Sequence, residues 1–188
     1  MTTLEPVAAS WIVVVPAKRL GAAKSRLGRL AGGRLAGGRL AGARRSELAL
    51  AMLVDTISAA RAAIGVRAAL VVTDDADVMA AALAHGAEVL PDRPAAGLNA
   101  AFAFGIDAVR AQDPDIGAVL LAGDLPALRP AQLEAVLDIA TRLVGMVAVA
   151  DRAGTGTTLL AARTPATLRP AFGPDSFARH RALGATAA

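Results

Sequence analysis

A loop carrying four cations follows the first apolar run of the chain. The run is WIVVV at residues 11–15, and the loop after it contains Lys18, Arg19, Lys24 and Arg26 among small residues. Cationic side chains at the end of a strand can bind a triphosphate and stabilise charge on a leaving pyrophosphate. The loop has neither GxxxxGK[ST] nor GxGxxG, so it is not a P-loop or a dinucleotide fingerprint. We therefore expect a phosphate-binding loop of another type, with a solvated surface loop as the alternative.

A carboxylate follows a second apolar run. Asp124 lies in LLAGDLPAL, between a glycine and a Leu-Pro pair. In open α/β sheets ligands bind beyond the carboxyl ends of the strands, which is where this pattern predicts Asp124. Mg²⁺ prefers one or two carboxylates together with phosphate oxygens and water. The sequence thus predicts Asp124 as a magnesium ligand, and a helix cap or turn residue is the alternative.

Two polar loops in the last quarter of the chain offer weaker signals. Residues 151–158 read DRAGTGTT, whose backbone amides and hydroxyls suit phosphate or carboxylate oxygens. Residues 172–180 read FGPDSFARH, where a Gly-Pro turn can precede a short helix whose first amides face an anion. A helix-start turn without a ligand explains the second pattern equally well. His180, beside Arg179, is expected to point toward the bound acceptor.

Short apolar runs alternate with amphipathic stretches of helix length. This is the pattern of βαβ units, and it predicts an α/β fold with a mainly parallel sheet covered by helices on both faces. Strands are expected at 11–15, 68–73, 87–90, 117–122, 146–150 and 157–162. Helices are expected from a Ser46 cap to 63, from an Asp74 cap to 85, over 98–111 and over 130–143. No linker is visible, so residues 1–188 are expected to form one domain.

The charge of the chain is concentrated in one segment. The net charge is +4, yet nine of the 20 basic residues and no acidic residue lie between Lys18 and Arg45. A local basic segment on an otherwise acidic domain indicates an anion site. Only 3% of the residues are aromatic, and because single-stranded nucleic acids stack on aromatic side chains, a triphosphate is favoured over nucleic acid.

Several other classes are disfavoured by composition. The chain has no cysteine, and therefore neither a disulfide framework nor a thiolate metal site. No run of about 18 apolar residues is present, and no basic region precedes the first apolar run as in a signal peptide. We expect a cytoplasmic protein without a membrane association.

Residues 28–42 consist of three copies of GRLAG. The period is too short for a solenoid, and each glycine weakens a helix by about 1 kcal/mol relative to alanine. We interpret the segment as a repeat expansion in a surface loop, with some frayed helix. A flexible basic lid over phosphates is the functional alternative.

The motifs occur together in an order that resembles one family, the phosphoenolpyruvate or 2-phospho-L-lactate guanylyltransferases of coenzyme F-420 biosynthesis. The resemblance covers about residues 11–185, and its two most specific parts are ADRxGTGT and FGPDSxxRH. It implies a Rossmann-like nucleotidyltransferase fold. It also implies transfer of GMP from GTP to the phosphate of the acceptor, with release of pyrophosphate. The motifs that carry it are VPAKRLGAAKSRL, LALAMLVDT, GLNAAF, LAGDLPAL, ADRAGTGTTLL and FGPDSFARH.

Site residues follow from the resemblance by position. It places the acceptor on Thr157, Gly173 and Ser176, and Mg²⁺ on Asp124. It places the GTP phosphates on Lys18, Lys24 and Arg26, of which the two lysines, with Asp124, are the expected catalytic groups. Asn99 is expected near the nucleoside.

Two features depart from the family pattern. The GRLAG repeats lengthen the loop after Arg26, and the family continues beyond RHxxxGA into a DxDTP strand that is thought to help hold metal, whereas this sequence stops at Ala188. We expect a shortened carboxyl end, or a second carboxylate from Asp151 or Asp175. The alternatives are a nucleotidyltransferase for another phosphorylated acceptor and a non-catalytic nucleotide-binding remnant. The sequence leaves the choice of acceptor and a homodimer open.

Overall fold

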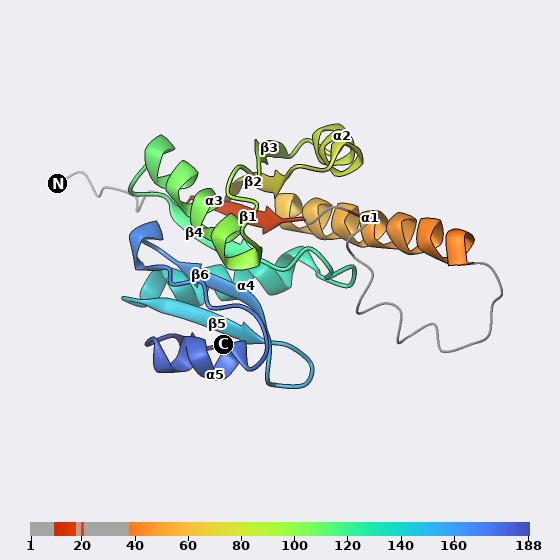
Figure 1. The fold of residues 1–188 in the computed structure, drawn as a ribbon. Coiled ribbons are helices and arrows are strands. Elements are labelled where there is room, and N and C mark those ends of the chain that lie inside the picture. The colour runs from red at the N-terminus through yellow and green to blue at the C-terminus, as the bar shows by residue number, and fades with distance from the viewer. Residues whose placement is uncertain (1–9, 18–19, 21–37) are drawn as a thin grey trace.

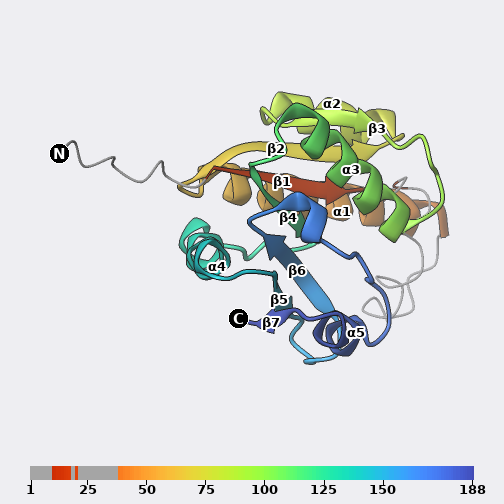
Figure 2. The same cartoon turned by 90° about the vertical axis from the view of Figure 1, so that its left-hand side faces the viewer.

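The computed structural model describes residues 10–17, 20 and 38–188. Its core is one seven-stranded sheet in the order β3-β2-β1-β4-β6-β5-β7, with helices packed on it (Figures 1 and 2). The strands are β1 (Trp11–Pro16), β2 (Val66–Thr73), β3 (Glu88–Pro91), β4 (Gly117–Leu121), β5 (Met146–Ala150), β6 (Thr157–Ala162) and β7 (Thr186–Ala187). Around them lie α1 (Gly38–Ala62), α2 (Ala76–Ala84), α3 (Leu98–Gln112), α4 (Pro130–Arg142), the 3-10 helix η3 (Pro165–Thr167) and α5 (Ser176–Ala182).

The two faces of the sheet are both buried. Side chains alternate between faces along a strand, and in β1 Val13 and Val15 belong to one core cluster while Ile12 and Val14 belong to the other. The first cluster receives side chains of α1, α2 and α4, and the second those of α3 and of the segment around Phe172. A sheet covered on both faces explains why the strands are continuous apolar runs. The predicted α/β class, with helices on both faces, is confirmed.

The sheet is parallel except around β6. Strands β1, β2, β3 and β4 pair in parallel, and β7 pairs in parallel with β5, whereas β6 runs antiparallel to both β4 and β5. The amino end of β6 therefore lies at the edge where β1, β4 and β5 have their carboxyl ends. This places Thr157, the first residue of β6, beside the residues that follow β4.

The predicted start of the first long helix was wrong. Helix α1 begins at Gly38 rather than at Ser46, so the last GRLAG copy is helical; the first two copies lie outside the described residues. Among the α1 side chains whose burial is described, from Arg44 on, Leu53 is the first that is buried. The helix extends past the sheet at its amino end (Figure 1). Ser46 lies inside the helix, and its hydroxyl donates to the backbone oxygen of Leu20 over 3.4 Å.

A second cap was misplaced by one residue. Asp75, rather than Asp74, caps α2, where its carboxylate accepts from the amides of Asp77 and Val78. The strands expected at 146–150 and 157–162 have those bounds, and the other expected strand ends are correct to within two residues. No helix in the described part of the chain is both long and apolar enough to cross a bilayer.

Candidate active site

The loop after β4 meets the end of β1 at the carboxyl edge of the sheet. A Cβ atom on Gly123 would lie 3.7 Å from the backbone oxygen of Pro16 and only 3.0 Å from the Leu53 side chain, so glycine permits this close approach. Across the sheet the amide of Ala122 donates to the oxygen of Thr158 over 2.9 Å. These contacts bring the ends of β1 and β4 and the start of β6 together.

Asp124 is exposed at this edge, and its loop is held by hydrogen bonds to α1. The next amide, that of Leu125, donates to the Thr56 hydroxyl over 3.0 Å, and this hydroxyl donates to the oxygen of Met52 over 2.7 Å. Thr56 is fully buried. The loop is thus tied to α1, while the carboxylate of Asp124 faces solvent where a ligand can reach it.

Thr157 and Ser176 form a buried polar pair. The amide of Thr157 donates to the Ser176 hydroxyl oxygen over 2.8 Å, although the residues are 19 positions apart. Ser176 is 1% exposed and Thr157 9% exposed. The structure therefore brings together two of the three residues expected to bind the acceptor.

His180 lies behind this pair. Its Nδ1 is 2.8 Å from the Thr157 hydroxyl oxygen, and its Nε2 accepts from the amide of Ala171 over 2.9 Å. The ring is fully buried and makes an edge contact with Phe172, with 5.0 Å between ring centroids. Burial, and to a lesser degree the neighbouring charge of Arg179, lowers the pKa of His180 below its usual value. The imidazole is therefore neutral near pH 7.

The loop before α5 is fixed on both sides. Asn99 at the start of α3 pairs with the backbone of Phe172: its Nδ2 donates to the carbonyl oxygen over 3.1 Å, and its Oδ1 accepts from the amide over 2.8 Å. On the other side the Arg179 guanidinium donates to the carbonyl oxygens of Ala171 and Pro174. Gly173 between them has φ +129°, a conformation that favours glycine.

The turn between β5 and β6 is held by Asp151. Its Oδ1 accepts from the amide of Thr155 over 3.1 Å, and its backbone accepts from Gly154 and donates to Gly156. A Cβ at Gly156 would collide with the Asp151 carboxylate, so a larger residue there would displace this side chain. Asp175 has φ 53° at the start of α5 and makes no capping bond. Among the described residues no cluster of three or more metal-ligating side chains occurs.

The expected triphosphate-binding cations Lys18, Lys24 and Arg26 lie outside the described residues. Leu20, in the same loop, is described. Its amide donates to Asp75 Oδ2 over 2.9 Å, so the α2 cap also holds Leu20.

Comparison with known proteins shows the family to which the chain belongs. The sequence profile of the family described as guanylyl transferase CofC like matches residues 11–185. The chain belongs to this family. It is 47% identical over 175 residues to a phosphoenolpyruvate guanylyltransferase of Streptomyces avermitilis, a match that covers 93% of this chain and 76% of the relative. It is 43% identical over 176 residues to the protein of the same name from Thermomonospora curvata, with 94% and 72% covered. The predicted family resemblance and nucleotidyltransferase class are confirmed.

Solved structures show the same fold at lower identity. A nucleotidyl transferase from Methanothermobacter superposes with a TM-score of 0.54 at 21% identity, covering 90% of this chain and 80% of the other. The Rv0371C protein of Mycobacterium tuberculosis, solved as a complex with manganese, gives 0.53 at 19% identity, with 96% and 89% covered. The Rossmann-like nucleotidyltransferase fold expected from the sequence is confirmed.

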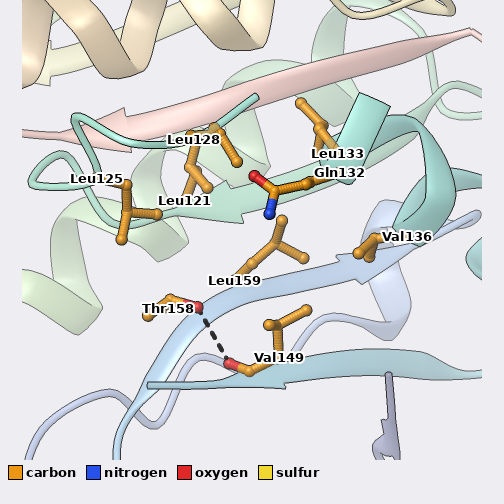
Figure 3. Close-up of a pocket in the computed structure, with 9 residues that line it drawn as sticks. All are labelled: Leu121, Leu125, Leu128, Gln132, Leu133, Val136, Val149, Thr158 and Leu159. Atoms are coloured by element: carbon orange, nitrogen blue, oxygen red, sulfur yellow. Dashed lines mark hydrogen bonds between the residues drawn. The ribbon is translucent and has the colours of Figure 1, made fainter. Parts of the chain in front are cut away.

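A hollow of about 220 Å³ lies elsewhere on this guanylyl transferase. It is mainly apolar and opens between the β4–α4 loop, α4 and the β5–β6 hairpin (Figure 3). Leu121, Leu133 and Leu159 in its wall belong to the first core cluster, whereas Phe172, on which His180 packs, belongs to the second. The hollow is thus on the opposite face from His180, and it contains none of the predicted site residues.

Sequence reasoning missed one residue of this candidate site, Thr56, and the contacts of another, His180. Thr56 stands in LALAMLVDT, and nothing in that pattern shows that its hydroxyl holds the Asp124 loop. His180 was expected to point toward the acceptor, but its contact with Thr157 spans 23 positions and has no local signature. The signal that could have found both is their presence inside the family motifs quoted above.

Proposed function

We propose that this guanylyl transferase moves GMP from GTP to phosphoenolpyruvate in coenzyme F-420 biosynthesis. The relatives that share 43–47% of its residues carry the name phosphoenolpyruvate guanylyltransferase. The observation that carries the proposal is the placement of Asp124 and Thr157 at one sheet edge. Such an edge offers a carboxylate for the metal-bound nucleotide next to hydroxyl donors for an anionic acceptor.

In the proposed reaction a phosphate oxygen of the acceptor forms a bond to the α-phosphorus of GTP. The bond from this phosphorus to the oxygen that bridges to the β-phosphate breaks, and pyrophosphate leaves with that electron pair. No proton needs to move, since the attacking oxygen is already anionic. Catalysis therefore rests on positioning and on charge stabilisation.

We assign the acceptor to Thr157, Gly173 and Ser176. The Ser176 hydroxyl oxygen accepts from the Thr157 amide, and the Thr157 hydroxyl oxygen lies 2.8 Å from Nδ1 of His180. When this nitrogen carries the ring proton, no acceptor for either hydroxyl proton is found in the described part of the chain. Two hydroxyl groups in this state are donors, which suits the carboxylate or phosphate of an acceptor. The backbone of Gly173 lies next to Arg179, which adds positive charge nearby.

The nucleotide is assigned to the other side of the edge. Lys18, Lys24 and Arg26 would meet the phosphates of GTP. Leu20, which lies between the two lysines in the sequence, is held by Asp75. The family resemblance implies a place for Asn99 near the nucleoside. Because both of its amide atoms bind Phe172, we propose that it acts on the site by holding the acceptor loop.

The exposed carboxylate of Asp124 fits a divalent ion. A single protein carboxylate suffices for Mg²⁺ when nucleotide phosphates and water supply the remaining oxygens. Bound there, Mg²⁺ would neutralise charge on the triphosphate. Asp151 is a poorer candidate for a second ligand, because one of its oxygens already accepts from Thr155.

We further propose that residues 1–188 act as one catalytic domain in the cytoplasm, and that neither nucleic acid nor membrane is a partner. A homodimer is compatible with this proposal and is decided by light scattering.

The test is turnover by the purified protein with GTP and Mg²⁺. Pyrophosphate release and ³¹P NMR of the product are followed with phosphoenolpyruvate, with 2-phospho-L-lactate and with 3-phosphoglycerate as the control acceptor. We expect the highest kcat/KM with phosphoenolpyruvate. Faster reaction with 2-phospho-L-lactate would reassign the acceptor. Binding of GTP without turnover on any acceptor would favour a non-catalytic role.

A further inference from the structure

The buried imidazole of His180 contacts no solvent, yet it touches the hydroxyl group that we assign to the acceptor. We propose that His180 is a positioning residue that directs the hydroxyl proton of Thr157 toward the anionic acceptor. This inference rests on the proposed function and assigns a role to a residue that binds no substrate itself.

The hydrogen bond at Nε2 determines the tautomer of His180. The backbone amide of Ala171 points at Nε2 over 2.9 Å, and an amide can only donate. Nε2 must therefore carry a lone pair, and in the neutral ring the single proton is on Nδ1. The opposite tautomer would set two N–H groups against each other in a buried place.

The tautomer then fixes the direction of the Thr157 hydroxyl. Nδ1–H donates to the hydroxyl oxygen over 2.8 Å, so this oxygen is the acceptor in that bond. Its own proton must point elsewhere, and no acceptor for it is found within the described ranges. If Nδ1 were unprotonated, the hydroxyl would donate to the ring and would be lost as a donor to a ligand.

The surroundings of Thr157 also favour a hydroxyl proton that points toward the acceptor. Its amide is already used by the Ser176 hydroxyl oxygen over 2.8 Å, and Thr157 retains 9% exposure whereas His180 has none. The ring is held in place by the Phe172 contact and by two hydrogen bonds. A hydroxyl oriented in advance has less rotational freedom to lose when an anion binds.

Two substitutions separate the positioning role from a structural one. His180→Asn can keep a donor near the place of Nδ1 and loses the acceptor for Ala171. His180→Gln can keep an acceptor near the place of Nε2 and loses the donor to Thr157. If His180 orients Thr157, the Gln variant should raise KM for phosphoenolpyruvate by about 10-fold or more, the size expected for a hydrogen bond to a charged group. The Asn variant should raise it less, and KM for GTP should stay within about twofold of the unchanged protein in both, since no bond to the nucleotide is altered.

A structural role predicts another pattern. If His180 only holds the Ala171 loop, the Gln variant should be the milder of the two. Any loss of activity should then parallel a loss of thermal stability, and it should not be confined to KM for one substrate. A Gln variant with unchanged KM for phosphoenolpyruvate, or equal effects of both variants, overturns the proposal. If either variant fails to fold, ¹⁵N NMR of the histidine-labelled wild-type chain decides the tautomer: signals of a protonated Nε2 in His180 overturn the inference, and a protonated Nδ1 supports it. The chain has two histidines, so His85→Gln assigns the signals.

The proposed function and the role of His180 can be disproved separately. Absence of turnover by the unchanged protein removes the proposed function and with it this role of His180. Normal turnover by the unchanged protein with no difference between the Asn and Gln variants removes the role of His180 alone.

Discussion

The strands β1 to β4 (the parallel half) and the β5–β6 hairpin with α5 (the hairpin half) contribute different kinds of groups to the candidate site. At the end of β4 the chain leaves the sheet in an exposed loop, and Asp124 presents a charge to solvent. At the start of β6 the polar groups are buried, neutral and bonded to one another, as in Thr157, Ser176 and His180. The first half can supply charge to a metal-bound nucleotide, and the second can supply fixed donors to an acceptor. Substitutions in the two halves should therefore change different kinetic constants.

The largest effect is expected in the parallel half, at Asp124. Asp124→Asn removes the carboxylate that we assign to Mg²⁺ and should lower kcat by about 100-fold or more, since small misplacement of reacting groups has costs of this size. Stability should not change, because the side chain is exposed. Asp138→Asn on α4 also removes an exposed carboxylate and should leave the rate intact. Equal rates for the Asp124 variant and the unchanged enzyme would remove the metal assignment.

In the hairpin half, Thr157→Val should act on one substrate. Loss of a hydrogen bond to a charged acceptor costs about 1.5–3 kcal/mol, so kcat/KM for phosphoenolpyruvate should fall by at least tenfold. KM for GTP should stay nearly constant. Thr158→Val is the neighbouring control, because that hydroxyl donates to the oxygens of Val149 and Ala150 in β5. A Thr157 variant that changes only KM for GTP would mean that the hairpin half binds the nucleotide rather than the acceptor.

Substitutions in the basic loop are expected to have a smaller effect, and this effect should be on the affinity for GTP. Lys24→Ala should weaken GTP binding by more than about 1.5 kcal/mol, the lower end for a charge-assisted hydrogen bond. Arg34→Ala, in the repeat, should change it little. Calorimetric titration with GTP measures both, and equal losses would show that the triphosphate contacts a wider part of the basic segment.

The structural support of Asp124 can be tested apart from its charge. Thr56→Val leaves the Leu125 amide without its partner, and a buried unsatisfied donor costs about 1–3 kcal/mol. Thermal unfolding should show the loss, and kcat should fall with the displaced loop. Thr141→Val is the control for loss of a helix hydroxyl that holds no loop, since the exposed Thr141 donates to the oxygen of Leu137 in its own helix. Thr56→Ser should restore both stability and rate.

The elements of the fold could be predicted from sequence where local pattern decides them. Strands β5 and β6 are short apolar runs whose bounds were predicted correctly. The start of α1 was not, because the glycines in the last repeat weigh against a helix that the structure nevertheless forms. The two-residue strand β7 has no sequence signal of its own, and it is defined only by pairing with β5.

The sequence predicted a set of candidate site residues but not the contacts among them. Asp124 and Thr157 follow from strand ends and family motifs. The two residues lie near each other because β6 runs antiparallel to β4, and the apolar pattern of the sequence does not indicate the direction of a strand. The bonds from Thr56 to Leu125 and from Thr157 to His180 join distant positions, so they could be found only in three dimensions.

The smallest expected effect concerns pH and the hairpin half. Burial, assisted by Arg179 on the same helix, lowers the pKa of His180, and the groups that face its ring from the described parts of β6 and the 171–172 segment are a hydroxyl, an amide and a phenyl ring, all uncharged. The unfolded chain, where histidine titrates near pH ~6.5, therefore binds more protons than the folded chain below that pH. The stabilisation is complete above about pH 6.5 and is lost as the pH falls toward the lowered pKa of the folded state. Urea unfolding at a series of pH values should show this decline, and the decline should be shallower in His180→Phe than in a His85→Gln control. A His180→Phe protein with the same pH profile as the unchanged protein would show that His180 is not the group held neutral, and the contrast between a charged and a neutral half would lose one of its supports.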